Sequence, residues 1–307
     1  MMELIHIVTA EEAGLTLHQL LRGPMALSGR QTRNAKAQGA VTVDAAPFFA
    51  NQKVHTGMVV RVQLDGYETH LTMPQQSCDV VEVVYEDDAL LAVFKPALLQ
   101  CHPSPSAPRG SDTLEGRVHA YLGYSAHPVH RLDSETTGIV LFAKLPYAQA
   151  HLQQQMQTGT FSKAYEAWVL GRPDPDEGEI DAPIARENPE SFTRIVTQDG
   201  QRAVSRYKAL RSVILPEGQA VSHIQLSPVT GRTHQLRVHM THIGCPLLGD
   251  TRYYTSDSLE ISARLGLTYH QLSAVSLCFI HPMTGRLLTI NHPARFDFDP
   301  EKAVLQR

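Results

Sequence analysis

The spacing of apolar residues predicts two helices and a small β-hairpin at the start of the chain. Leucines recur at near-helical spacing over residues 15–23, which indicates one helix. Ser28 can cap a second helix directly after it. Residues 40–64 then alternate between apolar and polar positions, with a turn at Asp44, as a hairpin requires. We therefore expect a separate small domain over residues 1–75.

The remainder of the chain mixes strands and helices without regular alternation. Residues 66–82 lack a clear period and are interpreted as a linker, and the chain becomes rich in strands from Val81 onward. A loop rich in proline and serine follows at 101–112, where Ser111 or Asp112 could cap the next helix. Irregular order of this kind predicts an α+β domain with a mainly antiparallel sheet over residues 76–307.

Three segments of this second domain carry candidate chemistry. Residues 138–144 are apolar on both alternating faces, which is typical of a central strand. In the strand expected over 161–171, Lys163 and Tyr165 share one face by the period of two. A helix is predicted over 233–243, where apolar residues recur at helical spacing.

Composition narrows the class of protein. The chain has 307 residues, of which 42% are hydrophobic and 19% charged, so a packed core in two domains is expected. No apolar run approaches the roughly 20 residues of a membrane span, and the first residues do not resemble a signal peptide. The four cysteines form no CxxC pair, which favours a reducing cytoplasm over a disulfide framework.

The net charge of −4 argues mildly against nucleic acid unless cations gather on one face. Arg30, Arg33 and Lys36 are spaced three apart on the second predicted helix and share a broad face. A solvated helix surface and a phosphate-binding face both fit such a trio.

An aspartate and an arginine suggest a reaction centre. Asp133 lies in the sequence HRLD, in a loop that feeds the predicted central strand. Arg232 lies at the start of the helix over 233–243, where a cation does not complement the helix dipole and needs an anion nearby. The candidate anion is Asp133. The sixteen histidines do not form a metal-ligand set with an acid or a cysteine, so no metal is expected.

Motifs in these segments resemble the RluA family of pseudouridine synthases. HRLDSETTG, FSKAYEAWVLG and GRTHQLRVHMTHIGCPLLGDTRY resemble three blocks of that family, and the likeness extends over about residues 80–295. The stretch from Leu27 to Val62 resembles an S4 RNA-binding domain and implies RNA contact through the cations of its helix. Departures from these patterns are Gly29, Met58, Leu99, Thr137 and Ser273.

The resemblance implies a role for each matched residue. Asp133 is the essential carboxylate, acting as a nucleophile or as a base towards the sugar. Arg232 matches its ion-pair partner, with Arg237 as the fallback. Tyr165 matches a tyrosine that stacks on the base and for which the resemblance also implies help with deprotonation at C5. Leu272 matches an apolar residue near the uracil.

The remaining predicted substrate contacts lie within the same motifs. The family acts on a uridine flipped out of the RNA, and Arg131 is placed either to fill the vacated gap or to contact phosphate. His130, Lys163 and Thr137 are further candidates. An isomerisation requires neither cofactor nor metal.

The resemblance favours ribosomal RNA as the partner and leaves transfer RNA open. Neither a membrane nor an obligate protein partner is implied, and the cytoplasm is the expected location. The alternative is a non-catalytic RNA-binding or ribosome-assembly factor that retains the fold, for which Asp133 would be dispensable.

Overall fold

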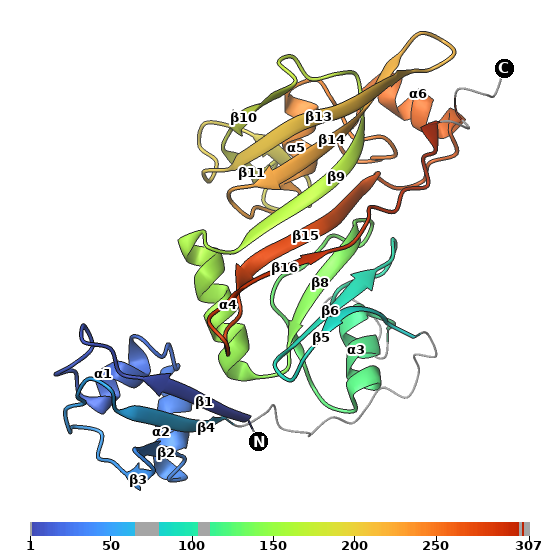
Figure 1. Cartoon of the computed structure of the whole chain (residues 1–307). Helices are drawn as coiled ribbons and strands as arrows, with labels where there is room; N and C mark the ends of the chain where they lie inside the picture. The colour runs from blue at the N-terminus through green and yellow to red at the C-terminus, as the bar shows by residue number, and fades with distance from the viewer. Residues whose placement is uncertain (1, 65–79, 104–110, 301–302, 304–307) are drawn as a thin grey trace.

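The computed structural model describes residues 2–64, 80–103, 111–300 and 303. Its strands form a four-stranded sheet near the N-terminus, a ten-stranded sheet and a two-stranded hairpin (Figure 1). The predicted domain boundary at 75–76 lies outside the described residues, as does most of the predicted linker.

The N-terminal unit is built as the apolar pattern predicts, with one added strand. Its sheet has the order β1-β4-β2-β3. Ser28 caps the second helix through a capping box with Gln31, as its position suggested. Asp44 and Ala45 both have positive φ and form the predicted turn. The elements are β1 (Met2–Ile7), α1 (Leu17–Arg22), α2 (Gly29–Ala37), β2 (Val41–Val43), β3 (Ala46–Pro47) and β4 (Val59–Leu64).

The large sheet is mainly antiparallel, as predicted. Its strand order is β10-β13-β14-β9-β15-β8-β6-β5, with β16 beside β15 and β7 beside β8. The strands are β5 (Glu82–Glu86), β6 (Leu90–Lys95), β7 (His127–Pro128), β8 (Thr137–Ala143), β9 (Ser162–Leu170), β10 (Glu177–Asp181), β13 (Val204–Ile214), β14 (Ala220–Pro228), β15 (Leu272–Ile280) and β16 (Leu287–Asn291).

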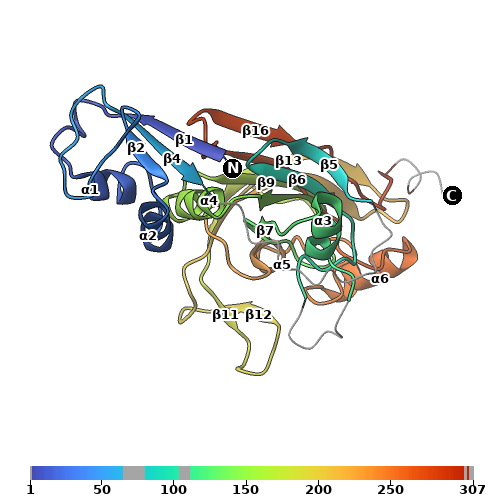
Figure 2. The ribbon, with the colours of Figure 1, turned by 90° about the horizontal axis from the view of Figure 1, so that it is seen from below.

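Three helices of this part lie on one side of the sheet. Figure 2 shows α3, α5 and α6 on the same side, where the hairpin β11–β12 also projects away from the body. The helix α3 is capped by Thr113, and not by Ser111 or Asp112 as expected, because the Thr113 side chain accepts from the Gly116 N–H. These elements are α3 (Leu114–Leu122), α4 (Pro146–Thr158), α5 (Gln235–His242), α6 (Ser256–Arg264), β11 (Ile184–Arg186) and β12 (Arg194–Val196).

The strand β8 is central and fully buried, as its two apolar faces predicted. It pairs antiparallel with β6 and parallel with β15, where Gly138 lies opposite Ala274. A Cβ atom on Gly138 would lie 2.2 Å from the carbonyl oxygen of Ala274. The two strands can approach this closely only because position 138 is glycine, which also tolerates the φ of 113° found there. The loop that carries Asp133 therefore leads directly into a rigid strand.

Candidate active site

Asp133 lies in the loop between β7 and β8. Its backbone carbonyl accepts a hydrogen bond from the Thr136 N–H at 3.1 Å, which closes a tight turn just before the strand. The side chain is 31% exposed, so the carboxylate is accessible from solvent although the strand behind it is buried. A reactive group at the end of a rigid strand is held in place without being enclosed.

A buried lysine fixes the chain beyond Asp133. The ammonium of Lys95, at the end of β6, donates to the carbonyls of Pro96, Leu99 and Ser134 at 2.7–2.8 Å. Burial lowers the pKa of Lys95 to about 8. Its side chain is fully enclosed, and its positive charge lies close enough to interact with Asp133.

A buried thiol holds the residue before Asp133. The Cys101 Sγ lies 3.3 Å from the backbone nitrogen of Leu132 and 3.4 Å from its carbonyl oxygen, so it can accept from one and donate to the other. Burial raises the pKa of Cys101 and keeps it a thiol. The loop is therefore held on both sides of the carboxylate.

Arg237, in α5, is the ion-pair partner of Asp133. Its Nη1 lies 3.3 Å from the Asp133 Oδ2, while Nε and Nη2 donate to the two carboxylate oxygens of Asp250 at 2.7 and 2.8 Å. The guanidinium also lies over the ring of Tyr253 at 5.0 Å. Burial alone would lower the pKa of Arg237, but its hydrogen bonds and charge interaction with Asp250 outweigh burial and raise it. Arg237 thus brings a permanent positive charge to Asp133.

The predicted pairing of Arg232 with Asp133 is wrong, and the fallback Arg237 takes that place. Arg232 is exposed, and its Nε donates to the carbonyl of Arg202 at 3.1 Å. The backbone of His234 is left-handed, with φ of 57°, and the helix begins only after it. Arg232 therefore stands outside the helix, whereas Arg237 lies within it.

Tyr165 and Leu272 belong to one buried apolar cluster, and Tyr165 lies close enough to Asp133 for a charge interaction. Both are buried and belong to the core cluster that includes Leu132, the neighbour of Asp133. Tyr165 on β9 pairs in register with Ala274 on β15, and Leu272 pairs with Ala167. Burial raises the pKa of Tyr165, and the negative charge of Asp133 raises it further, so the phenol is neutral at pH 7.

Two of the predicted substrate contacts face the protein interior. The ring of His130 is buried, and burial followed by the charge of Lys163 lowers its pKa to about 3. Its Nε2 accepts from the Leu141 N–H at 3.4 Å. The Thr137 hydroxyl lies 3.3 Å from the carbonyl oxygen of Leu272, to which it can donate. These contacts link the loop to neighbouring strands.

The other predicted cations remain accessible to differing degrees. Arg131 is exposed, with Nη1 3.1 Å from the Nε2 of His102. Lys163 is partly buried, and burial lowers its pKa. Arg30, Arg33 and Lys36 are all exposed on α2. Figure 1 shows that α2 lies apart from β8, so this trio does not belong to the reaction centre.

Three residues of the site, namely His234, Asp250 and Tyr253, had no predicted role in the reaction. The His234 Nδ1 lies 2.7 Å from the Tyr253 hydroxyl, and its Nε2 lies 3.8 Å from the Asp133 Oδ2. Asp250 is buried beneath Arg237. The block GRTHQLRVHMTHIGCPLLGDTRY contains all three, but sequence spacing does not reveal that they meet around Arg237.

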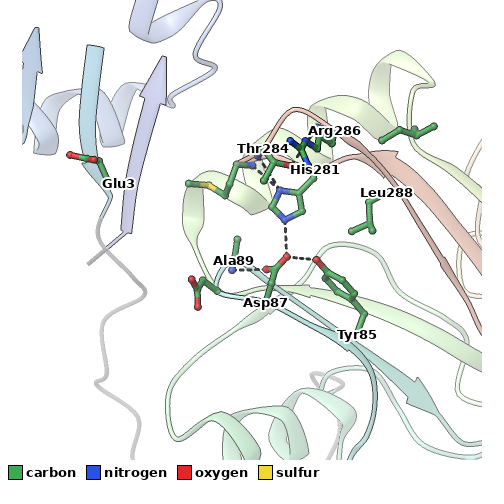
Figure 3. A pocket seen from close by; sticks show the side chains of 11 residues that line it. Glu3, Tyr85, Asp87, Ala89, His281, Thr284, Arg286 and Leu288 are labelled. Atoms are coloured by element: carbon green, nitrogen blue, oxygen red, sulfur yellow. Dashed lines mark hydrogen bonds and ion pairs between the residues drawn. The ribbon is translucent and has the colours of Figure 1, made fainter. Parts of the chain in front are cut away.

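A separate pocket lies beside β5, β6 and the turn between β15 and β16 (Figure 3). There Asp87 accepts hydrogen bonds from the Tyr85 hydroxyl at 2.5 Å and from His281 at 2.8 Å. Asp87 also accepts from the Ala89 N–H. This network joins two turns of the sheet, and the pocket lining contains none of the predicted site residues.

The described residues contain neither a metal-ligand cluster nor a helix that could span a membrane. Within 2–64, 80–103, 111–300 and 303, no group of three or more histidine, cysteine, aspartate or glutamate side chains could hold a metal ion. Over the same ranges, each helix is too short or too polar to cross a bilayer.

Comparison with known proteins identifies the type of site. Residues 89–242 match the family model described as RNA pseudouridylate synthase. An uncharacterized RNA pseudouridine synthase of Mycobacterium bovis is 30% identical over 96% of this chain and 95% of its own length. A ribosomal large subunit pseudouridine synthase D of Nitrosomonas europaea is 34% identical over 83% of this chain and 74% of its own. The structure of human RNA pseudouridylate synthase domain containing 1 shares the fold, with a TM-score of 0.59 and 24% identity over 71% of this chain and 85% of its own.

Proposed function

Because the chain belongs to the RNA pseudouridine synthase family and isomerises uridine in RNA, we propose that Asp133 is the carboxylate that carries the reaction. The observation behind this proposal is the pairing of a partly exposed Asp133 with the buried Arg237 at 3.3 Å. An arginine so placed holds a fixed positive charge against one oxygen of the carboxylate. Ionised Asp133 can attack the sugar carbon or take a proton from the sugar.

The isomerisation balances without a cofactor. The bond from ribose C1′ to uracil N1 breaks, the base turns, and a bond from C1′ to C5 forms. The C5 proton is then lost, and N1 gains a proton. Tyr165 is placed to stack on the uracil. Its raised pKa disfavours the phenolate at neutral pH, so we assign it a stacking role and not that of the base for C5.

The target uridine must leave the RNA stack to reach Asp133. Arg131 is exposed and lies two residues from Asp133 along the chain. We propose that Arg131 and Arg232 contact the RNA around the flipped nucleotide, and that the apolar side chain of Leu272 receives the uracil. Phosphate contacts of this kind position the RNA without selecting its sequence.

We further propose large-subunit ribosomal RNA as the substrate, in the cytoplasm, with transfer RNA as the alternative. A relative that shares 34% identity over 83% of this chain is named for the large ribosomal subunit. The test is pseudouridine mapping of total RNA from cells that lack the gene, rescued with wild type or with Asp133→Asn. One or a few large-subunit sites should disappear and return only with wild type. Unchanged sites, or full rescue by Asp133→Asn, would support a non-catalytic RNA-binding factor.

Residues 1–75 are proposed to be an S4-like RNA-binding domain in front of a catalytic domain over 76–307. The support is the apolar core of the N-terminal unit, which also contains Tyr147 of α4, and the exposed cations of α2. Replacing Arg30, Arg33 and Lys36 by alanine should weaken RNA binding. The affinity should also depend less steeply on salt concentration, because up to about three fewer counterions are released on binding. Filter binding over a salt series measures this. An affinity and a salt slope that both stay at the wild-type values would show that the trio is a solvated helix surface without RNA contact.

A further inference from the structure

Two donors converge on a single oxygen of Asp133. The Arg237 Nη1 lies 3.3 Å from Oδ2, and the His234 Nε2 lies 3.8 Å from the same atom. Among the described residues, no hydrogen bond to Oδ1 is found. The arrangement therefore leaves one oxygen of the carboxylate directed away from the protein donors and available to the substrate.

The hydrogen bonds around Tyr253 determine which nitrogen of His234 carries the proton. The Tyr253 hydroxyl accepts from the Arg194 N–H at 2.9 Å, which can only donate. The same hydroxyl lies 2.7 Å from the His234 Nδ1. If the hydroxyl donates its own proton to Nδ1, the backbone N–H of Arg194, the hydroxyl and Nδ1 each have a hydrogen-bond partner. The proton of the neutral ring then lies on Nε2, which faces Asp133.

The ring is neutral at physiological pH. Burial lowers the pKa of His234 to about 4, because the attraction of Asp133 is outweighed by burial together with the charges of Arg237, Arg252 and Arg194. A neutral donor can orient a carboxylate without adding a second full charge that would weaken it as a nucleophile.

The backbone of His234 is also unusual. Its φ of 57° places a non-glycine residue in the left-handed region, at the first turn of α5. Residues held in this conformation cost free energy and concentrate at functional sites. The conformation brings the ring between Tyr253 and Asp133, as the two distances show.

We propose that His234 is a positioning residue of the reaction centre: its Nε2–H donates to Asp133 Oδ2 in the substrate complex and turns Oδ1 towards the sugar. The apo distance of 3.8 Å is longer than a hydrogen bond, and catalytic contacts commonly tighten when the substrate binds. Tyr253 holds the ring, and Arg194 of the projecting hairpin holds Tyr253. The inference rests on the proposed role of Asp133.

Two substitutions separate this role from a backbone role. In His234→Gln, the amide nitrogen lies near the former Nε2 and can still donate to Asp133. In His234→Asn, the amide nitrogen reaches only the former Nδ1, while asparagine suits the left-handed conformation better than glutamine does. A role in backbone shape alone therefore predicts that asparagine is tolerated better, whereas the proposed role predicts the reverse.

The test is turnover kinetics of the full chain on the RNA identified by mapping. We expect kcat to fall about 10–100-fold in His234→Asn with KM unchanged, because losing a group that orients a reactive side chain commonly has an effect of this size. In His234→Gln, kcat should stay close to the wild-type value. Equal activity of the two variants, or a change confined to KM, would overturn the proposal. If wild type itself makes no pseudouridine, the proposed function fails instead.

A second measurement does not depend on activity. Long-range ¹H–¹⁵N spectra of histidine side chains, with the His234 signals assigned by their loss in His234→Gln, report the tautomer directly. We expect the Nε2–H form at pH 7, and a mixture of tautomers in Tyr253→Phe. An Nδ1–H form in the wild type would contradict the inferred direction of the donor.

Discussion

Asp133→Asn is expected to abolish the formation of pseudouridine and to leave RNA binding largely intact. Asparagine keeps the size of the side chain but removes the negative charge, so it can neither attack carbon nor take a proton. The loss in kcat should be about 10⁴-fold or more, the scale seen when an essential acidic or nucleophilic group is removed. Single-turnover assays on the mapped RNA measure the rate, and filter binding measures the affinity.

Glu135→Gln is the matched control for this experiment. Glu135 lies two residues further along the same loop, and its carboxylate lies 3.0 Å from the Nδ1 of His270. We expect its rate to stay within about tenfold of wild type, because the contact that it loses is with His270 and not with Asp133. If Asp133→Asn and Glu135→Gln showed similar activity, Asp133 would not be the catalytic carboxylate.

Arg237→Met is expected to damage both activity and stability. Methionine fills similar space but leaves Asp250, which is 2% exposed, without its counter-charge. Removing one partner of a buried ion pair costs about 3–5 kcal/mol. The same change frees the Asp133 carboxylate from its only arginine contact among the described residues. Urea unfolding and single-turnover kinetics report the two effects separately.

Two further variants separate the effects of Arg237. Arg232→Met removes a nearby exposed arginine and should weaken RNA binding without loss of stability. The double variant Arg237→Met with Asp250→Asn removes the stranded charge, so it should recover part of the stability while activity stays lost. If activity returned with stability, the contact between Arg237 and Asp133 would have no catalytic importance.

The stability deficit of Arg237→Met should depend on pH. Burial alone would raise the pKa of Asp250, but Arg237 outweighs it and the pKa is lowered in the wild type. Stability from such a group is present above its unfolded pKa and is lost as the pH falls towards the folded value. In the variant the buried carboxylate becomes easier to protonate. The deficit should therefore be largest near pH 7 and shrink towards about pH 4. A deficit independent of pH would contradict the buried-charge explanation.

Local signals in the sequence were sufficient to predict an element where residues within that element determine its structure. Ser28 begins a helix because its side chain caps the backbone within three residues. The central position of β8 followed from apolar residues on both faces. The strand β1 was missed because it alternates only weakly, and its partner β4 is more than fifty residues away along the chain, with Met2 opposite Leu64.

The choice between Arg232 and Arg237 could not be made from spacing. Both lie within the same matched motif, and the outcome depends on the left-handed backbone at His234 and on the buried Asp250 beneath Arg237. These are tertiary features. Thr137, by contrast, keeps the hydroxyl expected from the motif, and that hydroxyl bonds to β15.

The parallel contact between β8 and β15 has a consequence for how the enzyme is made. Thr137 pairs with Ser273, which the ribosome adds much later, and Arg237 also follows Asp133 by more than a hundred residues. Contacts between distant parts of the chain slow folding, because the intervening loop must close first. A nascent chain that has exposed Asp133 but not yet β15 lacks Leu272, the residue that we propose receives the uracil. This protein can therefore modify RNA only after the ribosome has synthesised β15, which lies in the last third of the chain.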